Sequence, residues 1–93
     1  MGIELESVVS RVQGHISAEV DGELVVLSVE QGKYFGFDDI AQVIWERLKE
    51  PVRVASLCLE LGSEFDAAPL TIETDVLRLL NRLHSEEMIV LAS

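Results

Sequence analysis

The chain has 93 residues, nearly half of them hydrophobic, and a formal net charge of −10 at pH 7. This length suits a single domain spanning residues 1–93 with a modest core. No apolar run approaches the roughly 20 residues of a membrane helix, and the start, with Glu4 and Glu6, lacks the basic segment of a secretion signal, so we expect a cytoplasmic protein with no membrane contact.

The first 14 residues leave two structures open. Four apolar residues fit one face of a helix, although the run at 7–12 could instead add to a sheet. These residues are Leu5, Val8, Val9 and Val12. Residues 15–20 then alternate with the period of two that is typical of a strand, with Ile16, Ala18 and Val20 on one side.

Two turns and two further strands follow. The run at 24–29 is apolar on both faces, which predicts a strand covered on both sides. Asp21-Gly22 ahead of it is a strong hairpin signal, and Gly32 behind it can supply the positive φ of a second tight turn. We therefore expect a three-stranded antiparallel meander that ends with the strand at 33–37.

A helix is predicted next, because the apolar period changes from two to between three and four residues. Asp38 or Asp39 is well placed to cap its first turn, and Pro51 ends it. Trp45, the only tryptophan of the chain, lies in this helix and is expected to anchor the core. The expected buried face consists of Ile40, Ala41, Val43, Ile44, Trp45 and Leu48.

A second helix is indicated by apolar residues with the i, i+3, i+4, i+7 spacing. They are Val54, Leu57, Cys58 and Leu61. Phe65 extends the same face if Gly62 is tolerated inside the helix. Cys58 is the only cysteine, so the chain has no internal disulfide, and its place on the apolar stripe favours a packing role.

A third helix begins with Thr71 as its cap, and Glu73 and Asp75 lie in its first turn, where the helix dipole favours negative charge. Its buried stripe is Val76, Leu79, Leu80 and Leu83. Residues 88–91 form a last strand or a tail packed on the core. The whole pattern predicts an α+β, winged-helix-like fold, in which a three-stranded antiparallel sheet is followed by a three-helix bundle.

Charge and composition argue against two functional classes. Arg78 and Arg82 on the third helix are offset by nearby acids, and the acidic chain would repel nucleic-acid phosphates. The only histidines, His15 and His84, form no recognisable catalytic or metal-ligand pattern, and the glycines form no phosphate loop. We therefore expect no enzyme, no metal, no cofactor and no nucleic-acid partner.

An ordered set of residues resembles the PqqD-like family, whose members are known as RiPP recognition elements. The set is Asp21-Gly22, Leu24 to Leu27, Gly32 to Phe37, Ile44-Trp45, Leu57, Leu61, Phe65, Thr71, Asp75-Val76, Leu79-Leu80 and Leu83. The Tyr-Phe-Gly form of the aromatic strand looks most like the stand-alone proteins of lasso-peptide clusters. Three positions depart from the family pattern: Asp38 replaces Asn, Ala41 replaces Gly, and Glu87 replaces the Gly before the final apolar run.

The resemblance implies a non-catalytic protein that binds the leader segment of a ribosomally made precursor peptide and delivers it to a leader peptidase and a cyclase. In the family the leader adds an antiparallel strand to the third strand of the sheet, so the resemblance implies that it pairs here with residues 33–37 and that its side chains enter a groove beside the third helix. The expected peptide-binding residues are Lys33, Tyr34, Phe35, Gly36, Phe37, Asp75, Val76, Arg78, Leu79, Arg82 and Leu83.

Some of these residues have a structural interpretation as well. Phe35, Phe37 and Leu83, with Leu80, could equally pack in the core. The three with polar tips, Tyr34, Arg78 and Arg82, are better placed to face a ligand, although the two arginines with Asp75 could form a merely solvated face. The alternatives are a peptide chaperone for a radical enzyme of quinone-cofactor synthesis and an acidic winged-helix regulator. The leader motif, the pathway and the oligomeric state stay open.

Overall fold

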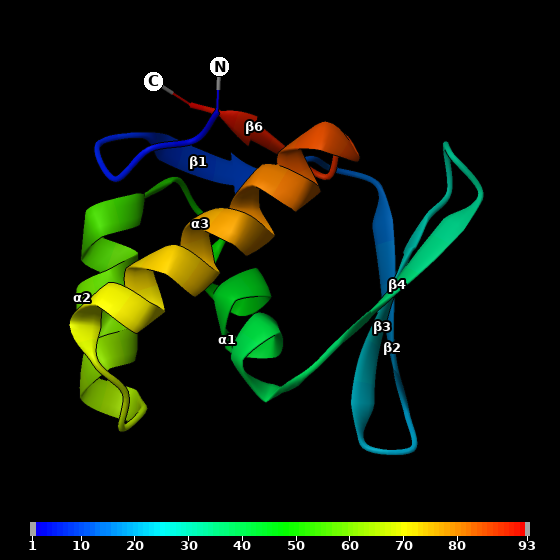
Figure 1. Ribbon diagram of the computed structural model, residues 1–93. Helices are drawn as coiled ribbons and strands as arrows, with labels where there is room; N and C mark the ends of the chain where they lie inside the picture. The colour runs from blue at the N-terminus through cyan, green and yellow to red at the C-terminus, as the bar shows by residue number, and fades with distance from the viewer. Residues whose placement is uncertain (1, 93) are drawn as a thin grey trace.

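The computed structural model describes residues 2–92 and contains two small antiparallel sheets and three helices. In chain order the elements are β1 (Val8–Arg11), β2 (His15–Val20), β3 (Glu23–Ser28), β4 (Lys33–Phe37), α1 (Asp39–Arg47), β5 (Val52–Arg53), α2 (Val54–Glu64), α3 (Pro69–Ser85) and β6 (Ile89–Leu91). One sheet has the order β2-β3-β4 and the other the order β5-β1-β6. Figure 1 shows the β2-β3-β4 sheet standing to one side of a body formed by the helices and the second sheet.

The predicted meander is confirmed, because β3 pairs antiparallel with both β2 and β4. Asp21 and Gly22 have φ values of 51° and 82°, the two positive angles that a type I′ turn requires. Gly32 in the second turn has φ of 68°. The two turns predicted from the sequence therefore connect the three strands of the meander.

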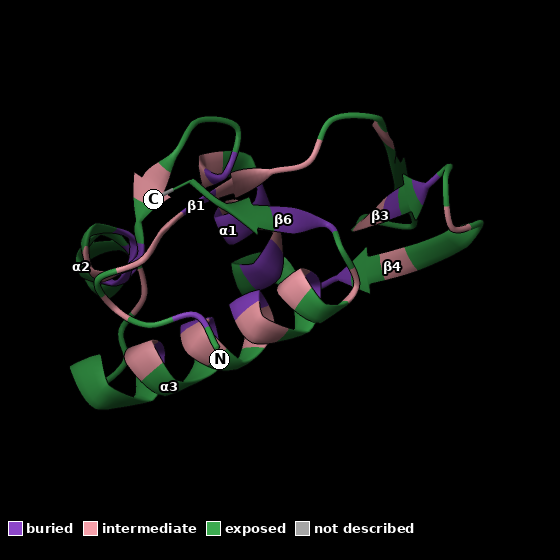
Figure 2. Ribbon diagram, turned by 90° about the horizontal axis from the view of Figure 1, so that it is seen from above, coloured by how far each residue is buried: buried purple, intermediate pink, exposed green. Residues whose placement is uncertain are grey.

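Only one face of this sheet is covered, so the expectation that residues 24–29 are buried on both sides was wrong. Val26 is completely buried, but Leu27 is 36% exposed and Val29 lies beyond the strand end at 59%. Ile16, the cross-strand partner of Leu27, is also exposed, at 56%. Because the sheet stands apart from the helices, its outer face meets solvent; Figure 2 shows β4 mostly exposed and β3 a mixture of buried, intermediate and exposed residues.

The core lies where the three helices meet the inner face of both sheets. Trp45 contacts Phe37 with a ring-centroid distance of 5.6 Å and is 1% exposed, which confirms it as a core anchor. Asp38 is the N-cap of α1, and its Oδ1 accepts a hydrogen bond from the Ala41 backbone N–H at 2.9 Å. Ile40 departs from the expected buried face and is 42% exposed.

The ends of the helices differ in part from those predicted. α1 ends at Arg47, with Leu48 as its C-cap, ahead of Pro51. Gly62 is accommodated within α2, and the four residues of its predicted stripe are all buried. α3 starts at Pro69, so Thr71 is not its cap; proline at the first position has the φ angle of a helix and needs no hydrogen bond to its missing N–H. Its first turn consequently carries no acidic residue.

The N-terminal segment resolves as a strand that does not join the meander. β1 pairs with β5 and with β6, so residues 88–91 contribute a last strand. Ahead of β1, the Asn81 side chain of α3 accepts a hydrogen bond from the Ile3 N–H at 2.7 Å, and its Nδ2 donates to Leu77 O and to Ile3 O. This contact ties the start of the chain to α3. No helix among residues 2–92 is long and apolar enough to cross a membrane.

Candidate peptide-binding site

β4 is an edge strand. It pairs with β3 on one side, and within residues 2–92 no strand pairs with its other side. Backbone N–H and C=O groups on such an edge can pair with a further strand from another chain. Lys33, Phe35 and Phe37 face the helices, and Tyr34 and Gly36 face outward, in the alternation the sequence predicted.

A hollow of about 290 Å³ lies at the end of β4, between the start of α1 and the middle of α3. Its apolar lining comes from Ile40, Ala41, Ile44 and Leu79, and its charged rim from Asp38, Asp75, Arg78 and Arg82. Asp75 and Arg78 form an ion pair at 3.8 Å that is mostly exposed and therefore weak. The hollow suits an apolar side chain with polar groups near it.

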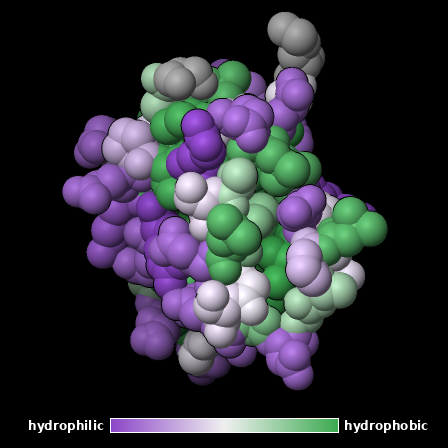
Figure 3. All heavy atoms as spheres, turned by 90° about the vertical axis from the view of Figure 1, so that its left-hand side faces the viewer, coloured by the Kyte–Doolittle hydropathy of each residue, from purple (hydrophilic) through white to green (hydrophobic). Residues whose placement is uncertain are grey.

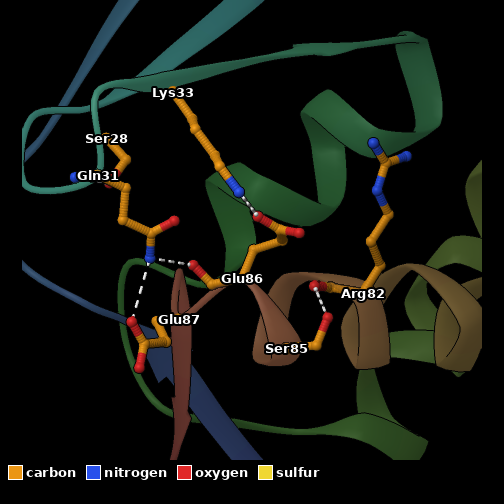
Figure 4. Close-up of polar contacts among 7 residues, drawn as sticks. All are labelled: Ser28, Gln31, Lys33, Arg82, Ser85, Glu86 and Glu87. Atoms are coloured by element: carbon orange, nitrogen blue, oxygen red, sulfur yellow. Dashed lines mark hydrogen bonds and ion pairs between the residues drawn. The ribbon is translucent and has the colours of Figure 1, made fainter.

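The other end of β4 is held against α3 by a set of polar contacts that we call the latch. Gln31 Nε2 donates to the Glu86 carbonyl at 2.8 Å and to Glu87 Oε2 at 3.2 Å, and Lys33 Nζ lies 3.4 Å from Glu86 Oε2. Figure 4 shows both side chains reaching from the hairpin to the end of α3, with Arg82 on an earlier turn of the helix. The latch and the hollow thus lie at opposite ends of β4.

The predicted site residues differ in how far they are exposed and in which face of the sheet they occupy. Lys33, Gly36, Asp75, Arg78 and Arg82 are exposed, and Phe35 and Leu79 are partly buried. Tyr34 is 75% exposed, but it lies on the outer face of the sheet, opposite the helices. A peptide paired with β4 would meet Tyr34 on that outer face, away from the helices.

Three predicted site residues belong to the core instead. Phe37, Val76 and Leu83 are exposed by only 5%, 1% and 2%. A side chain that is fully enclosed by its own protein offers no contact area to a ligand, so Phe37 and Leu83 follow the core interpretation that the sequence allowed, and Val76 offers no contact surface in this structure. Leu80, with 0% exposure, follows the core interpretation that the sequence allowed.

Sequence reasoning missed the contribution of α1 to the hollow. Asp38, Ile40, Ala41 and Ile44 line it together with α3. The apolar period of the helix assigned Ile40 to the core, yet the first turn of α1 projects past the end of β4. The position of Ile40 could have indicated this exposure, because Ile40 comes directly after Asp38 and Asp39, the candidate capping residues that follow the strand.

Three titratable residues outside the candidate site, His15, Glu46 and Cys58, have surroundings that are defined by local contacts. His15 is half-buried, with Nδ1 3.0 Å from Val12 O and its ring edge-on to Trp45. A hydrogen bond from Lys49 holds the pKa of Glu46 below its usual range. Burial first, and then the charge of Glu73, raises the pKa of the Cys58 thiol. Within the described part of the chain no group of three or more His, Cys, Asp or Glu side chains could hold a metal ion.

The fold and this edge define a class: a small winged-helix-like domain with an open strand edge beside a helix-lined hollow. The model of the family PqqD, coenzyme PQQ synthesis protein D, matches residues 23–89. The chain belongs to the PqqD family, which confirms the resemblance seen in the sequence.

Individual relatives agree with this assignment. The PqqA binding protein of Xanthomonas euvesicatoria pv. vesicatoria strain 85-10 is 39% identical over 52 residues, which cover 56% of each chain. The match thus spans little more than half the length of this curated relative. The solved structure of TbiB1 in complex with the TbiA(beta) leader peptide has a TM-score of 0.76 and 29% identity, covering 86% of this chain and 93% of that one. A lasso peptide synthetase B1 complexed with the leader peptide also has a TM-score of 0.76, at 24% identity, covering 88% of this chain and 96% of that one.

Proposed function

We propose that this protein binds the leader segment of a ribosomally synthesised precursor peptide of the lasso type and delivers it, without catalysing a reaction itself, to a leader peptidase and a cyclase. The observation that carries the proposal is the free edge of β4 beside the hollow between α1 and α3. The leader-peptide complex of the similar TbiB1 supports it.

The edge of β4 and the hollow have different roles in recognition. Backbone pairing with the five residues of β4 supplies affinity with little sequence information. The hollow supplies selectivity, because it accepts an apolar side chain of the leader over Ile40 and Leu79. An antiparallel leader runs from the Phe37 end of β4 toward Lys33, so its earlier residues meet the hollow and the remainder of the precursor leaves near the latch.

Leader binding is tested by titrating a labelled leader peptide, from a precursor encoded beside this gene, and following fluorescence polarisation. We expect the Ile40→Ser variant to bind about tenfold more weakly, since it removes most of one apolar contact, equivalent to roughly 1.4 kcal/mol. Leu59→Ser is the matched control, because it removes a similar side chain that is 76% exposed on α2. If the unmodified protein binds neither leader nor full precursor, the proposed function is wrong.

A second candidate function has specific support from the family model and from the PqqA binding protein that the chain resembles. In that case the bound peptide is the precursor of a quinone cofactor, presented to a radical enzyme. The same titration with a PqqA-type peptide separates the two candidates, since the hollow selects one side-chain pattern. Tighter binding of the PqqA-type peptide than of any lasso leader would favour the second.

A further inference from the structure

A second hollow lies on the opposite side of the molecule from the β4 edge. It measures about 400 Å³, and it lies between α2, the start of α3 and the segment ahead of β1. Leu5, Ala55, Cys58, Leu59 and Pro69 supply most of its apolar lining. It shares no lining residue with the hollow at the end of β4. In Figure 1, α2 and the β2-β3-β4 sheet lie at opposite ends of the molecule.

Two leucines beside this second hollow are exposed without a partner in the described structure. Leu59 lines it and is 76% exposed, and Leu70, which follows the lining residue Pro69, is 74% exposed. Figure 3 shows several hydrophobic residues on this side of the molecule, interspersed with pale and hydrophilic ones and flanked by hydrophilic residues. An apolar hollow with exposed leucines and a polar border is the usual composition of a docking surface for another protein.

Glu73 is the charged residue among those that line the second hollow. Residues that directly precede or follow lining residues in the sequence include four further acids, Glu4, Glu6, Glu60 and Asp66. Of these, Glu60 is paired with Arg47 at 3.0 Å. The raised pKa of Cys58, caused by burial and then by the charge of Glu73, is consistent with a negative potential inside.

This electrostatic pattern selects among possible occupants. A second copy of the chain would bring the same Glu73 and a net charge of −10, so the two would repel each other at short range. A partner with lysine or arginine beside its apolar contact would be attracted instead. Since the second hollow is remote from β4, such a partner can bind while the β4 edge is occupied.

We propose that the second hollow, with Leu59 and Leu70, docks the enzyme that processes the precursor, through an apolar side chain flanked by basic residues. The proposal rests on the proposed function, because it assumes that the protein brings a bound precursor to an enzyme. It assigns separate surfaces to the cargo and to the enzyme, so that a ternary complex can form.

The test uses the full chain and the processing enzymes encoded beside its gene, each purified. Binding of each enzyme is measured by sedimentation for the unmodified protein and for Leu59→Ser, Leu70→Ser and Glu73→Gln. We expect each leucine variant to weaken enzyme binding at least tenfold and Glu73→Gln to weaken it less at physiological salt. Leader affinity should stay within twofold in all three. Ile16→Ser is the control, because it removes another large exposed apolar side chain, 56% exposed, from β2, away from the second hollow.

Cys58 gives an independent readout, because the single cysteine lines the second hollow. Saturating enzyme should slow its alkylation by N-ethylmaleimide at least threefold, and saturating leader alone should not. The proposal is overturned if no processing enzyme binds the unmodified protein, if the leucine variants bind it as tightly as the unmodified protein, or if they instead break a dimer of this chain. Failure of the proposed function would give a different result, because the protein would then bind an enzyme but neither the leader nor the precursor.

Discussion

Glu87, just after the end of α3, has an unfavourable backbone conformation, and its position departs from the family pattern in the sequence. Glu87, where the family pattern has Gly, has φ of 62°. The Met88 N–H bonds Leu83 O and the Glu87 N–H bonds His84 O, which is the hydrogen-bond pattern of a Schellman motif. A side chain in this left-handed conformation costs roughly 1 kcal/mol, offset in part by the Glu87 contact with Gln31.

We expect Glu87→Gly to raise the free energy of unfolding by about 1 kcal/mol, because glycine adopts this conformation without a steric penalty. Glu87→Ala is the control, since it removes the same carboxylate but keeps a Cβ. Urea denaturation followed by circular dichroism measures both. A glycine variant no more stable than the alanine variant would contradict the assignment of strain to the backbone.

The buried thiol predicts a pH dependence of stability. Because the pKa of Cys58 is raised on folding, the folded protein keeps its proton at pH values where the unfolded chain loses it. This contribution is complete below the thiol pKa of the unfolded chain, about 8.5, and is lost as the pH rises above it. The stability advantage of the unmodified protein over Cys58→Ala should therefore shrink between pH 7.5 and pH 10. Urea denaturation at a series of pH values measures it, and a constant or growing difference would refute the prediction.

Side-chain burial at the candidate site was only partly predictable at this scale. Alternation along 33–37 correctly separated Tyr34 from Phe35 and Phe37, because a strand places successive side chains on opposite faces. It gave no information on how deeply each would be enclosed. Phe37 is buried against Trp45, a contact between separate elements that no local pattern encodes.

At the scale of elements, the start of α1 both ends β4 and forms part of the hollow, so its cap links stability to binding. Asp38→Ala should lower the free energy of unfolding by about 1 kcal/mol, since the Ala41 N–H loses its acceptor. Asp38→Asn, which introduces the residue usual in the family, should retain nearly all of the free energy of unfolding of the unmodified protein. Thermal unfolding distinguishes them, and an asparagine variant as unstable as the alanine variant would show that charge, not capping, matters.

Elements with a strong local signal were predicted, and those that depend on distant partners were not. The turns at Asp21-Gly22 and Gly32 specified the meander, and the spacing in α2 specified its buried stripe. β5 has only two residues, and it becomes a strand by pairing with β1, far away in the sequence. The start of α3 was misplaced because Pro69 initiates the helix without a side-chain cap.

At the scale of the whole molecule, the β2-β3-β4 sheet and the helical body are stabilised to different degrees. Most of the completely buried side chains lie in the helices and in the β5-β1-β6 sheet, and Val26 is the β2-β3-β4 sheet's own member of that set. Regions with few buried contacts open at a lower free energy than the core. The latch holds the Lys33 end of β4 against the end of α3.

Hydrogen exchange tests whether the latch controls this opening. In a variant carrying Gln31→Ala and Lys33→Ala, the amides of β2, β3 and β4 should exchange with an opening free energy lower by about 1 kcal/mol, since exposed hydrogen bonds and ion pairs each contribute up to about that amount. Amides of β1 and α3 should be unchanged. Lys49→Ala is the matched control, because Lys49 and Lys33 have the same 60% exposure and each forms one ion pair with a glutamate. Equal changes in the sheet and the body would mean that the molecule opens as one unit, and the leader would then bind to an edge whose distance from α3 is fixed by the core instead of by the latch.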